Sequence, residues 1–180
     1  MYYERYRKKL IVIEVALKSL RMDVQSSTPV VLLSEIGGLE RTLPIFIGPP
    51  EATAIAMIIQ EIEAPRPMTH DLLLKSVEAL QGRLERVLIT ELKDRIFLAE
   101  LIIKNPVGDD LTVSARPSDA IALALRSEVK IFVNDDLMEQ EGLFLPSSAF
   151  EDDDSGDSAD EILGEFKEFL DTLKPEDFSS

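Results

Sequence analysis

The only histidine of the chain, His70, lies in a short run that carries several side chains with useful chemistry. Asp71 follows it directly, and Arg66 precedes it by four residues. Arginine can hold two oxygens of a phosphate, and histidine can act as a general base or as a metal ligand. The same residues also fit a purely structural interpretation, in which Thr69 caps a helix, His70 packs and Arg66 pairs with an acid. The residues alone leave both interpretations open.

A second run, Arg116-Pro-Ser-Asp119, repeats the combination of a cation, a proline, a hydroxyl group and an acid at the expected start of a helix. Three expected helices have an acid in the first turn, namely Glu51, Asp71 and Asp119. The helix dipole stabilises such a carboxylate by about 0.3–1 kcal/mol, which is a sufficient structural reason for it. Helix N-termini also bind phosphate, and gathered carboxylates can ligate Mg²⁺ or Mn²⁺. If the two proline-arginine turns lie side by side, they form a pocket suited to a phosphodiester.

Composition restricts the classes of protein and of site. The chain has 180 residues, of which 45% are hydrophobic and 29% charged, and it contains no cysteine. This length predicts about one domain with an appendage. The lack of cysteine excludes disulfides, thiolate metal sites and cysteine nucleophiles. We find no apolar run long enough to span a membrane and no secretory signal, so we expect a cytoplasmic protein with no membrane association.

The charge of the chain is acidic and unevenly distributed. The net charge is −15, and residues 151–180 alone carry twelve acids and two lysines. Proteins that bind nucleic acid through general electrostatics normally have an excess of basic residues. Contact with nucleic acid would therefore depend on a local basic patch or on bound cations.

Hydrophobic periodicity and turn residues predict an α+β fold. We expect a mostly antiparallel mixed sheet, built from hairpins and a meander and packed with three helices. The expected strands are 10–20, 30–33, 42–47, 86–92, 96–103, 111–115 and 131–133, and the expected helices are 49–63, 70–81 and 117–127, with a helical turn at 135–141.

Two local features carry more specific expectations. Pro44 cannot donate a ladder hydrogen bond, so its strand should lie at an edge of the sheet or be irregular there. In the helix at 70–81, Thr69 is the expected N-cap and Gly82 the expected stop, and the spacing of four apolar residues predicts a buried stripe. These residues are Leu72, Leu73, Val77 and Leu80.

The resulting organisation has four parts: a basic N-terminal segment over residues 1–9, a folded domain over 10–150, an acidic linker over 151–160, and a C-terminal amphipathic helix with its tail over 161–180. The tethered helix presents its apolar residues at helical spacing, so it should pack in a groove of its own domain or of a partner. Edge strands and this apolar face also favour a homo-oligomer.

Three motifs together resemble the bifunctional nuclease domain family over roughly residues 10–145. They are Pro44-Ile-Phe-Ile-Gly48 with Glu51-Ala-Thr-Ala-Ile-Ala56, Pro65-Arg-Pro-Met-Thr-His-Asp-Leu72, and Arg116-Pro-Ser-Asp-Ala-Ile-Ala-Leu123. The resemblance implies a compact α+β fold that tends to oligomerise and that acts on both DNA and RNA. It makes six residues candidates for the site: Glu51, Arg66, His70, Asp71, Arg116 and Asp119.

We therefore expect a metal-assisted phosphodiesterase that acts on DNA or RNA. Asp71, Asp119 and Glu51 would ligate Mg²⁺ or Mn²⁺, which would activate water and stabilise the leaving oxygen. His70 would be the general base or would orient the water, and Arg66 or Arg116 would neutralise the phosphate. The alternative is a non-catalytic regulatory module that binds an anionic ligand or a protein partner.

Overall fold

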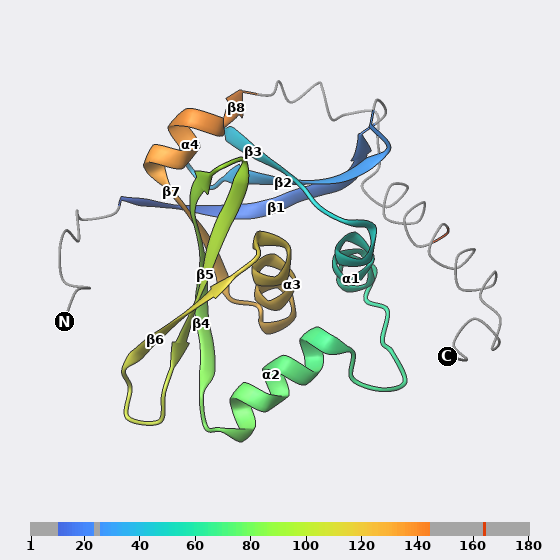
Figure 1. Ribbon diagram of the computed structural model, residues 1–180, viewed down its shortest axis with the longest axis vertical. Coiled ribbons are helices and arrows are strands. Elements are labelled where there is room, and N and C mark those ends of the chain that lie inside the picture. Colours follow the sequence, from blue (N-terminus) through green and yellow to red (C-terminus); the bar gives the residue numbers. More distant parts are fainter. Residues whose placement is uncertain (1–10, 24–25, 145–163, 165–180) are drawn as a thin grey trace.

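The computed structural model describes residues 11–23, 26–144 and 164, and these residues form one mixed sheet with helices (Figure 1). Eight strands follow the spatial order β6-β5-β4-β7-β1-β2-β3-β8. The strands are β1 Val12–Asp23, β2 Thr28–Glu35, β3 Arg41–Phe46, β4 Arg83–Lys93, β5 Ile96–Lys104, β6 Asp110–Ala115, β7 Lys130–Asn134 and β8 Leu143–Phe144. Among the described strands, β4 and β7 form the one parallel pair, and the other pairs are antiparallel.

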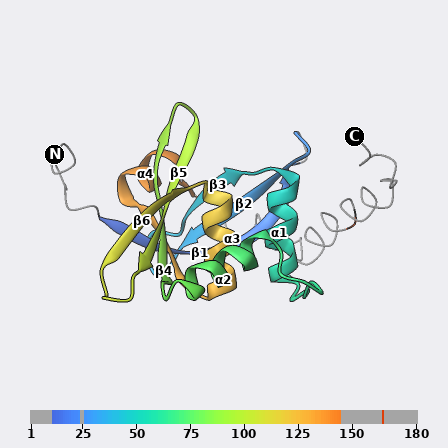
Figure 2. The ribbon, with the colours of Figure 1, turned by 60° about the horizontal axis from the view of Figure 1, so that its bottom comes forward.

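Four helices accompany the sheet: α1 Pro49–Ile59, α2 Thr69–Ala79, α3 Pro117–Ser127 and the short α4 Asp135–Glu141. Figure 2 shows α1, α2 and α3 gathered on one side of the sheet, with α3 between α1 and the strands β4 to β6. The α+β fold class is thereby confirmed. The expected acidic linker and C-terminal amphipathic helix lie outside the described residues. None of the helices within those residues is long and apolar enough to cross a bilayer.

The core lies between the sheet and the helices α1 and α3. Val31 and Leu33, which share one face of β2, are fully buried there. The helices contribute mostly alanine to this interface, including Ala52, Ala56 and Ala120, each fully buried. Small side chains let the two helix backbones approach the sheet and each other closely, and α1 packs directly against α3.

Pro44 occupies the position that its chemistry requires. It pairs with Leu32 of β2 on one side, whereas β8 pairs only with Arg41 and Thr42 on the other. The outer side of β3 at Pro44 therefore has no strand partner among the described residues, which confirms the expected edge-like position.

The helix boundaries differ from the expected ones for identifiable reasons. Helix α1 ends at Ile59 rather than near residue 63, because Glu61 takes a left-handed conformation (φ 53°) and the N–H of Ile62 bonds the carbonyl of Met57. This arrangement is a Schellman motif that closes the helix. Helix α2 ends in the same way, with Gln81 rather than Gly82 in the left-handed position. Its N-cap is Met68, and Thr69 is the first helical residue.

The predicted buried stripe of α2 is wrong. Leu72, Leu73 and Leu80 are 60%, 44% and 79% exposed, and α2 contains no fully buried residue. The helix packs instead through a different face, in which Leu74 meets the core and Asp71 meets α3. The ion pair between Asp71 and Arg126 of α3 thus determines which face of α2 packs inward. Leu72, Leu73 and Leu80 remain exposed.

Candidate active site

Two helix starts lie together because α1 and α3 pack side by side. Each helix follows a strand and opens with proline, whose fixed φ suits the first helical turn: Pro49 follows β3, and Pro117 follows β6. Glu51 therefore lies in the first turn of α1, and Asp119 lies in the first turn of α3. Arg116 is the N-cap residue of α3, so its side chain starts at the same helix end as Asp119.

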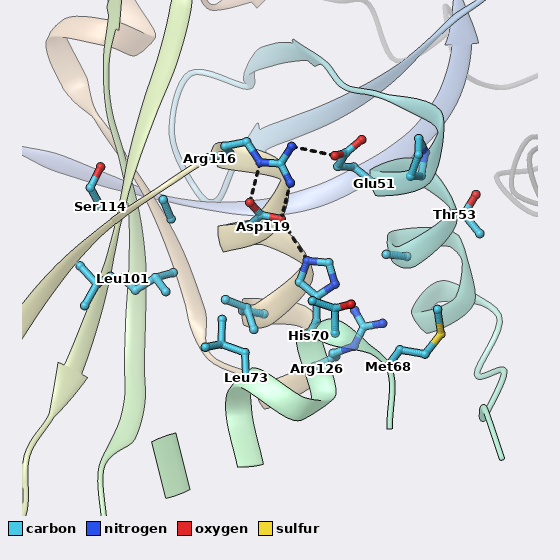
Figure 3. Close-up of a pocket in the computed structure, with 16 residues that line it drawn as sticks. Glu51, Thr53, Met68, His70, Leu73, Leu101, Ser114, Arg116, Asp119 and Arg126 are labelled. Atoms are coloured by element: carbon cyan, nitrogen blue, oxygen red, sulfur yellow. Dashed lines mark hydrogen bonds and ion pairs between the residues drawn. The ribbon is translucent and has the colours of Figure 1, made fainter. Parts of the chain in front are cut away.

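Arg116 joins the two carboxylates. Its Nε and Nη2 donate to the two oxygens of Asp119 at 2.7 and 3.0 Å, and its Nη1 donates to Glu51 Oε1 at 2.8 Å (Figure 3). The hydrogen bond to Asp119 raises the pKa of Arg116 above its ordinary value. The Arg116 side chain is nevertheless 65% exposed, so an anion can reach it from solvent.

His70 completes the group from α2. Its Nε2 lies 3.2 Å from Asp119 Oδ1, and the two side chains are 14% and 28% exposed. Burial alone would raise the pKa of Asp119, but the hydrogen bonds from Arg116 and His70 outweigh it and lower that pKa. Asp119 therefore stays ionised at neutral pH. When the ring proton resides on Nε2, the imidazole donates to Asp119 and Nδ1 carries the lone pair of a base.

Asp71 has a different position from its neighbour. One carboxylate oxygen accepts the backbone N–H of Met68 at 2.8 Å, and the other accepts Nε of Arg126 at 2.8 Å. Burial raises the pKa of Asp71, yet these two hydrogen bonds lower it on balance. Asp71 thus fixes the first turn of α2 to α3, and this holds His70 against Asp119.

These polar side chains line a half-open pocket of about 570 Å³. Of the six candidates from the sequence, Glu51, His70, Arg116 and Asp119 line this pocket. Arg66 and Asp71 do not line it, and Arg66 is exposed on the segment before α2. The structure thus brings four of the six candidates together.

Arg126 is a charged pocket residue that was not among the six candidates from the sequence. It lines the pocket beside His70, and its side chain is only 10% exposed. A signal was present in the sequence, since Asp119, Leu123 and Arg126 follow the spacing of one helix face and all three line the pocket. The candidates on α3 were confined to the start of the helix, and Arg126 lies about two turns further along the same face.

The donor set for a divalent ion is not assembled in the described part of the chain. No group of three or more His, Cys, Asp or Glu side chains there is arranged to hold a metal. The two carboxylates that line the pocket, Glu51 and Asp119, are bridged by Arg116. Ligation of Mg²⁺ or Mn²⁺ by these two residues would first require the guanidinium to move away.

The lowered pKa values of Asp71 and Asp119 predict a loss of stability in acid. The unfolded chain binds protons near the ordinary value of 3.8, whereas the folded chain holds these carboxylates ionised to lower pH. Their stabilising contribution is therefore present above this value and is lost as the pH falls through the folded-state pKa values. We expect the free energy of unfolding, measured by urea denaturation, to decrease between about pH 6 and about pH 3.

Two variants isolate the contribution of Asp71. Asp71→Asn should show a smaller decrease between the two pH values than the unchanged protein. Asp94→Asn is the matched control, because Asp94 is exposed in the turn between β4 and β5 with a left-handed φ of 51° that asparagine also accepts. An equal decrease in all three proteins would contradict the assignment.

The fold and the pocket define a class: a single α+β sheet domain in which a His-Asp pair and an ion-paired arginine meet at two adjoining helix starts. The model of one protein family, the bifunctional nuclease domain, matches residues 31–146. The chain belongs to this bifunctional nuclease domain family. The matched range includes every strand from β3 to β8 and all four pocket residues that the sequence singled out.

Relatives with curated names fall into two groups. An uncharacterized protein of Mycobacterium tuberculosis is 41% identical over 167 residues, which cover 93% of this chain and 98% of that protein. Bifunctional nuclease 2 of Oryza sativa subsp. japonica is 27% identical over 118 residues, or 64% of this chain and 36% of that protein. Bifunctional nuclease 1 of Oryza sativa subsp. indica is 25% identical over 126 residues, or 69% of this chain and 38% of that protein.

Proposed function

We propose that this protein is a nuclease that cleaves phosphodiester bonds of DNA or RNA at the pocket between α1, α2 and α3. The observation that carries the proposal is the placement of His70 against Asp119, with Arg116 on the same carboxylate. A base held by a carboxylate, next to a cation, is what hydrolysis of a phosphate ester needs. The names of the plant relatives support the same reaction class.

The proposed reaction is attack by water. His70 accepts a proton from a water molecule as the water oxygen bonds to phosphorus. The bond from phosphorus to one sugar oxygen breaks, and this oxygen takes up the proton from His70. The products are one phosphomonoester and one free hydroxyl group. Asp119 stabilises the imidazolium that exists between the two proton transfers, and it keeps the ring oriented throughout.

Arg116 would bind the phosphate by exchanging one partner. Its Nε and Nη2 fork remains on Asp119, whereas Nη1 leaves Glu51 and donates to a phosphate oxygen. The bond to Glu51 is the one to exchange, because it is a single hydrogen bond and the Arg116 side chain is exposed to solvent. A planar guanidinium supports two such contacts at once, which an ammonium group does not.

The variant Glu51→Gln distinguishes two roles of Glu51, as the ion-pair partner of Arg116 or as a metal ligand. If Glu51 only pairs with Arg116, the amide weakens that pair, and the KM for an oligonucleotide should fall or stay within about twofold with kcat preserved. If Glu51 ligates Mg²⁺ or Mn²⁺, removal of its charge should lower kcat by about 100-fold or more, and excess metal should restore part of it. Steady-state kinetics at several metal concentrations distinguish the two results. We expect the first one.

A non-catalytic module remains the second candidate. The net charge of −15 favours it, because an acidic protein repels nucleic acid.

The experiment that tests the proposed function uses labelled single-stranded DNA, duplex DNA and RNA, each with Mg²⁺, with Mn²⁺ and with EDTA. Cleavage of any substrate that is lost in His70→Ala supports a nuclease, whereas no cleavage under any condition favours a module that binds an anion or a protein. Cytoplasmic location and homo-oligomerisation stay predictions.

A further inference from the structure

The pocket has two chemically different parts. Glu51, Arg116 and Asp119 lie together at the starts of α1 and α3, whereas Leu73 and Leu101 form an apolar wall in another part of the pocket (Figure 3). The exposed residues of this wall are Leu73 of α2 and Val113 of β6, and Leu101 of β5 is buried. A simple phosphate or a short anion at Arg116 would leave this wall uncovered. The wall therefore indicates a ligand that carries a flat or apolar group next to its phosphate.

Strand register explains why the wall faces the pocket. Leu101 and Val113 are directly opposite each other in the β5–β6 pair, so both side chains point to the same face of the sheet, the one that bears the helices. Helix α2 packs mainly against α3 and β4 rather than against β5 or β6. The space between α2 and the end of the sheet is consequently open, and Leu73 and Val113 remain 44% and 45% exposed across it.

We infer that this pocket takes one unpaired nucleotide, with its base against Leu73, Leu101 and Val113 and its phosphate at Arg116, so that the substrate is single-stranded nucleic acid. The inference rests on the proposed function. A pocket of about 570 Å³ lies in the size range of pockets that enclose a small ligand, and it has room for one nucleotide. Burial of a base face against exposed apolar side chains is favourable.

A duplex fits this pocket less well for two reasons. Its bases are stacked and paired, so none can reach the apolar wall unless it is first extruded from the helix at a cost in stacking and pairing. Its phosphates are also dense, at about one charge per 1.7 Å of axis, and would need an extended basic surface. The pocket offers two arginines, Arg116 and Arg126, beside Glu51 and Asp119. A single strand can present one phosphate to this site and direct its neighbours away.

The test compares one oligodeoxynucleotide as a single strand and as a duplex, together with single strands that carry an abasic residue at successive positions. We expect the single strand to be cut at least about tenfold faster than the duplex. Removal of the base beside the cleaved phosphate should slow cleavage at that position about tenfold, because the phosphate remains but the contact with the wall is lost.

Two neighbouring leucines of α2 provide a matched pair of variants. Leu73→Gln should slow cleavage of the intact single strand about tenfold and have little further effect next to the abasic residue. Leu72→Gln changes a neighbouring, more exposed leucine that does not line the pocket, and it should leave the rate within about twofold. Leu73→Met, which preserves the apolar surface, should retain most of the activity.

The outcomes separate the inference from the function on which it rests. Equal rates on single strand and duplex, or equal effects of Leu73→Gln and Leu72→Gln, would overturn the inference. If cleavage is still lost in His70→Ala in that case, the nuclease itself stands. Cleavage of none of these substrates by the unchanged protein would overturn both.

Discussion

Replacement of His70 by alanine is expected to lower kcat/KM for oligonucleotide cleavage by about 100- to 10,000-fold, the usual contribution of a positioned general base. The ring is held at 3.2 Å from Asp119 and is the only imidazole in the chain, so no second histidine can replace it. The loss should be mainly in kcat, because the group acts on the attacking water rather than on binding of the substrate. Initial rates with a labelled single strand measure it.

Two further measurements exclude a trivial loss through unfolding. His70→Gln retains a side-chain donor for Asp119 but cannot titrate, so it should fold normally, as checked by thermal melting, and still be inactive. Added imidazole should restore part of the activity to His70→Ala, since the small base can occupy the vacated space. A folded His70→Ala protein that keeps most of its rate would show that the base lies elsewhere.

Removal of the Arg116 guanidinium is expected to be the second large effect, at about 100- to 1,000-fold in kcat/KM for Arg116→Ala. Two functions are lost together, the contact with the phosphate and the fork that orients Asp119. Arg116→Lys should recover only a small part of this loss, because a single ammonium cannot hold Asp119 and a phosphate oxygen in the same geometry.

Arg83→Ala is the matched control for this prediction. Arg83 is also a highly exposed arginine, at 73%, and is also paired with a carboxylate, Glu85 at 3.3 Å, but it lies outside the candidate pocket. Its removal should change kcat/KM by no more than about twofold at fixed salt. If the two alanine variants lose activity equally, the role of Arg116 is general electrostatic attraction rather than contact in the pocket.

The sequence predicted those parts of the fold that depend on local rules. Helices α1 and α3 begin at the prolines where we expected them, and β4 and β5 pair across the expected turn. Each of these features depends on only a few neighbouring residues. The helix ends were less predictable. Glu61 and Gln81 take left-handed conformations that are usually assigned to glycine, and nothing in their residue types indicates this.

The sequence predicted which residues form the candidate site, but not which of their side chains pair with each other. The sequence identified Glu51, His70, Arg116 and Asp119, which the fold brings together from three helices. It did not show that Arg116 bridges the two acids, because this contact depends on how α1 packs against α3. The orientation of α2 could not be predicted from its own residues either. Asp71 of α2 pairs with Arg126 of α3, so the face with Asp71 packs inward. The face with Leu73 is then left toward solvent and the pocket.

The proposed function requires that this chain itself cleaves phosphodiester bonds through the His70–Asp119 pair. The most direct test follows cleavage of labelled single-stranded DNA across the size-exclusion peak of the protein, alongside an Asp119→Asn variant purified in the same way. We expect the activity to coincide with the protein peak and to be absent from the folded variant, which has lost the carboxylate that orients both His70 and Arg116. Activity that elutes away from the peak, or that is equal in the variant, would contradict it.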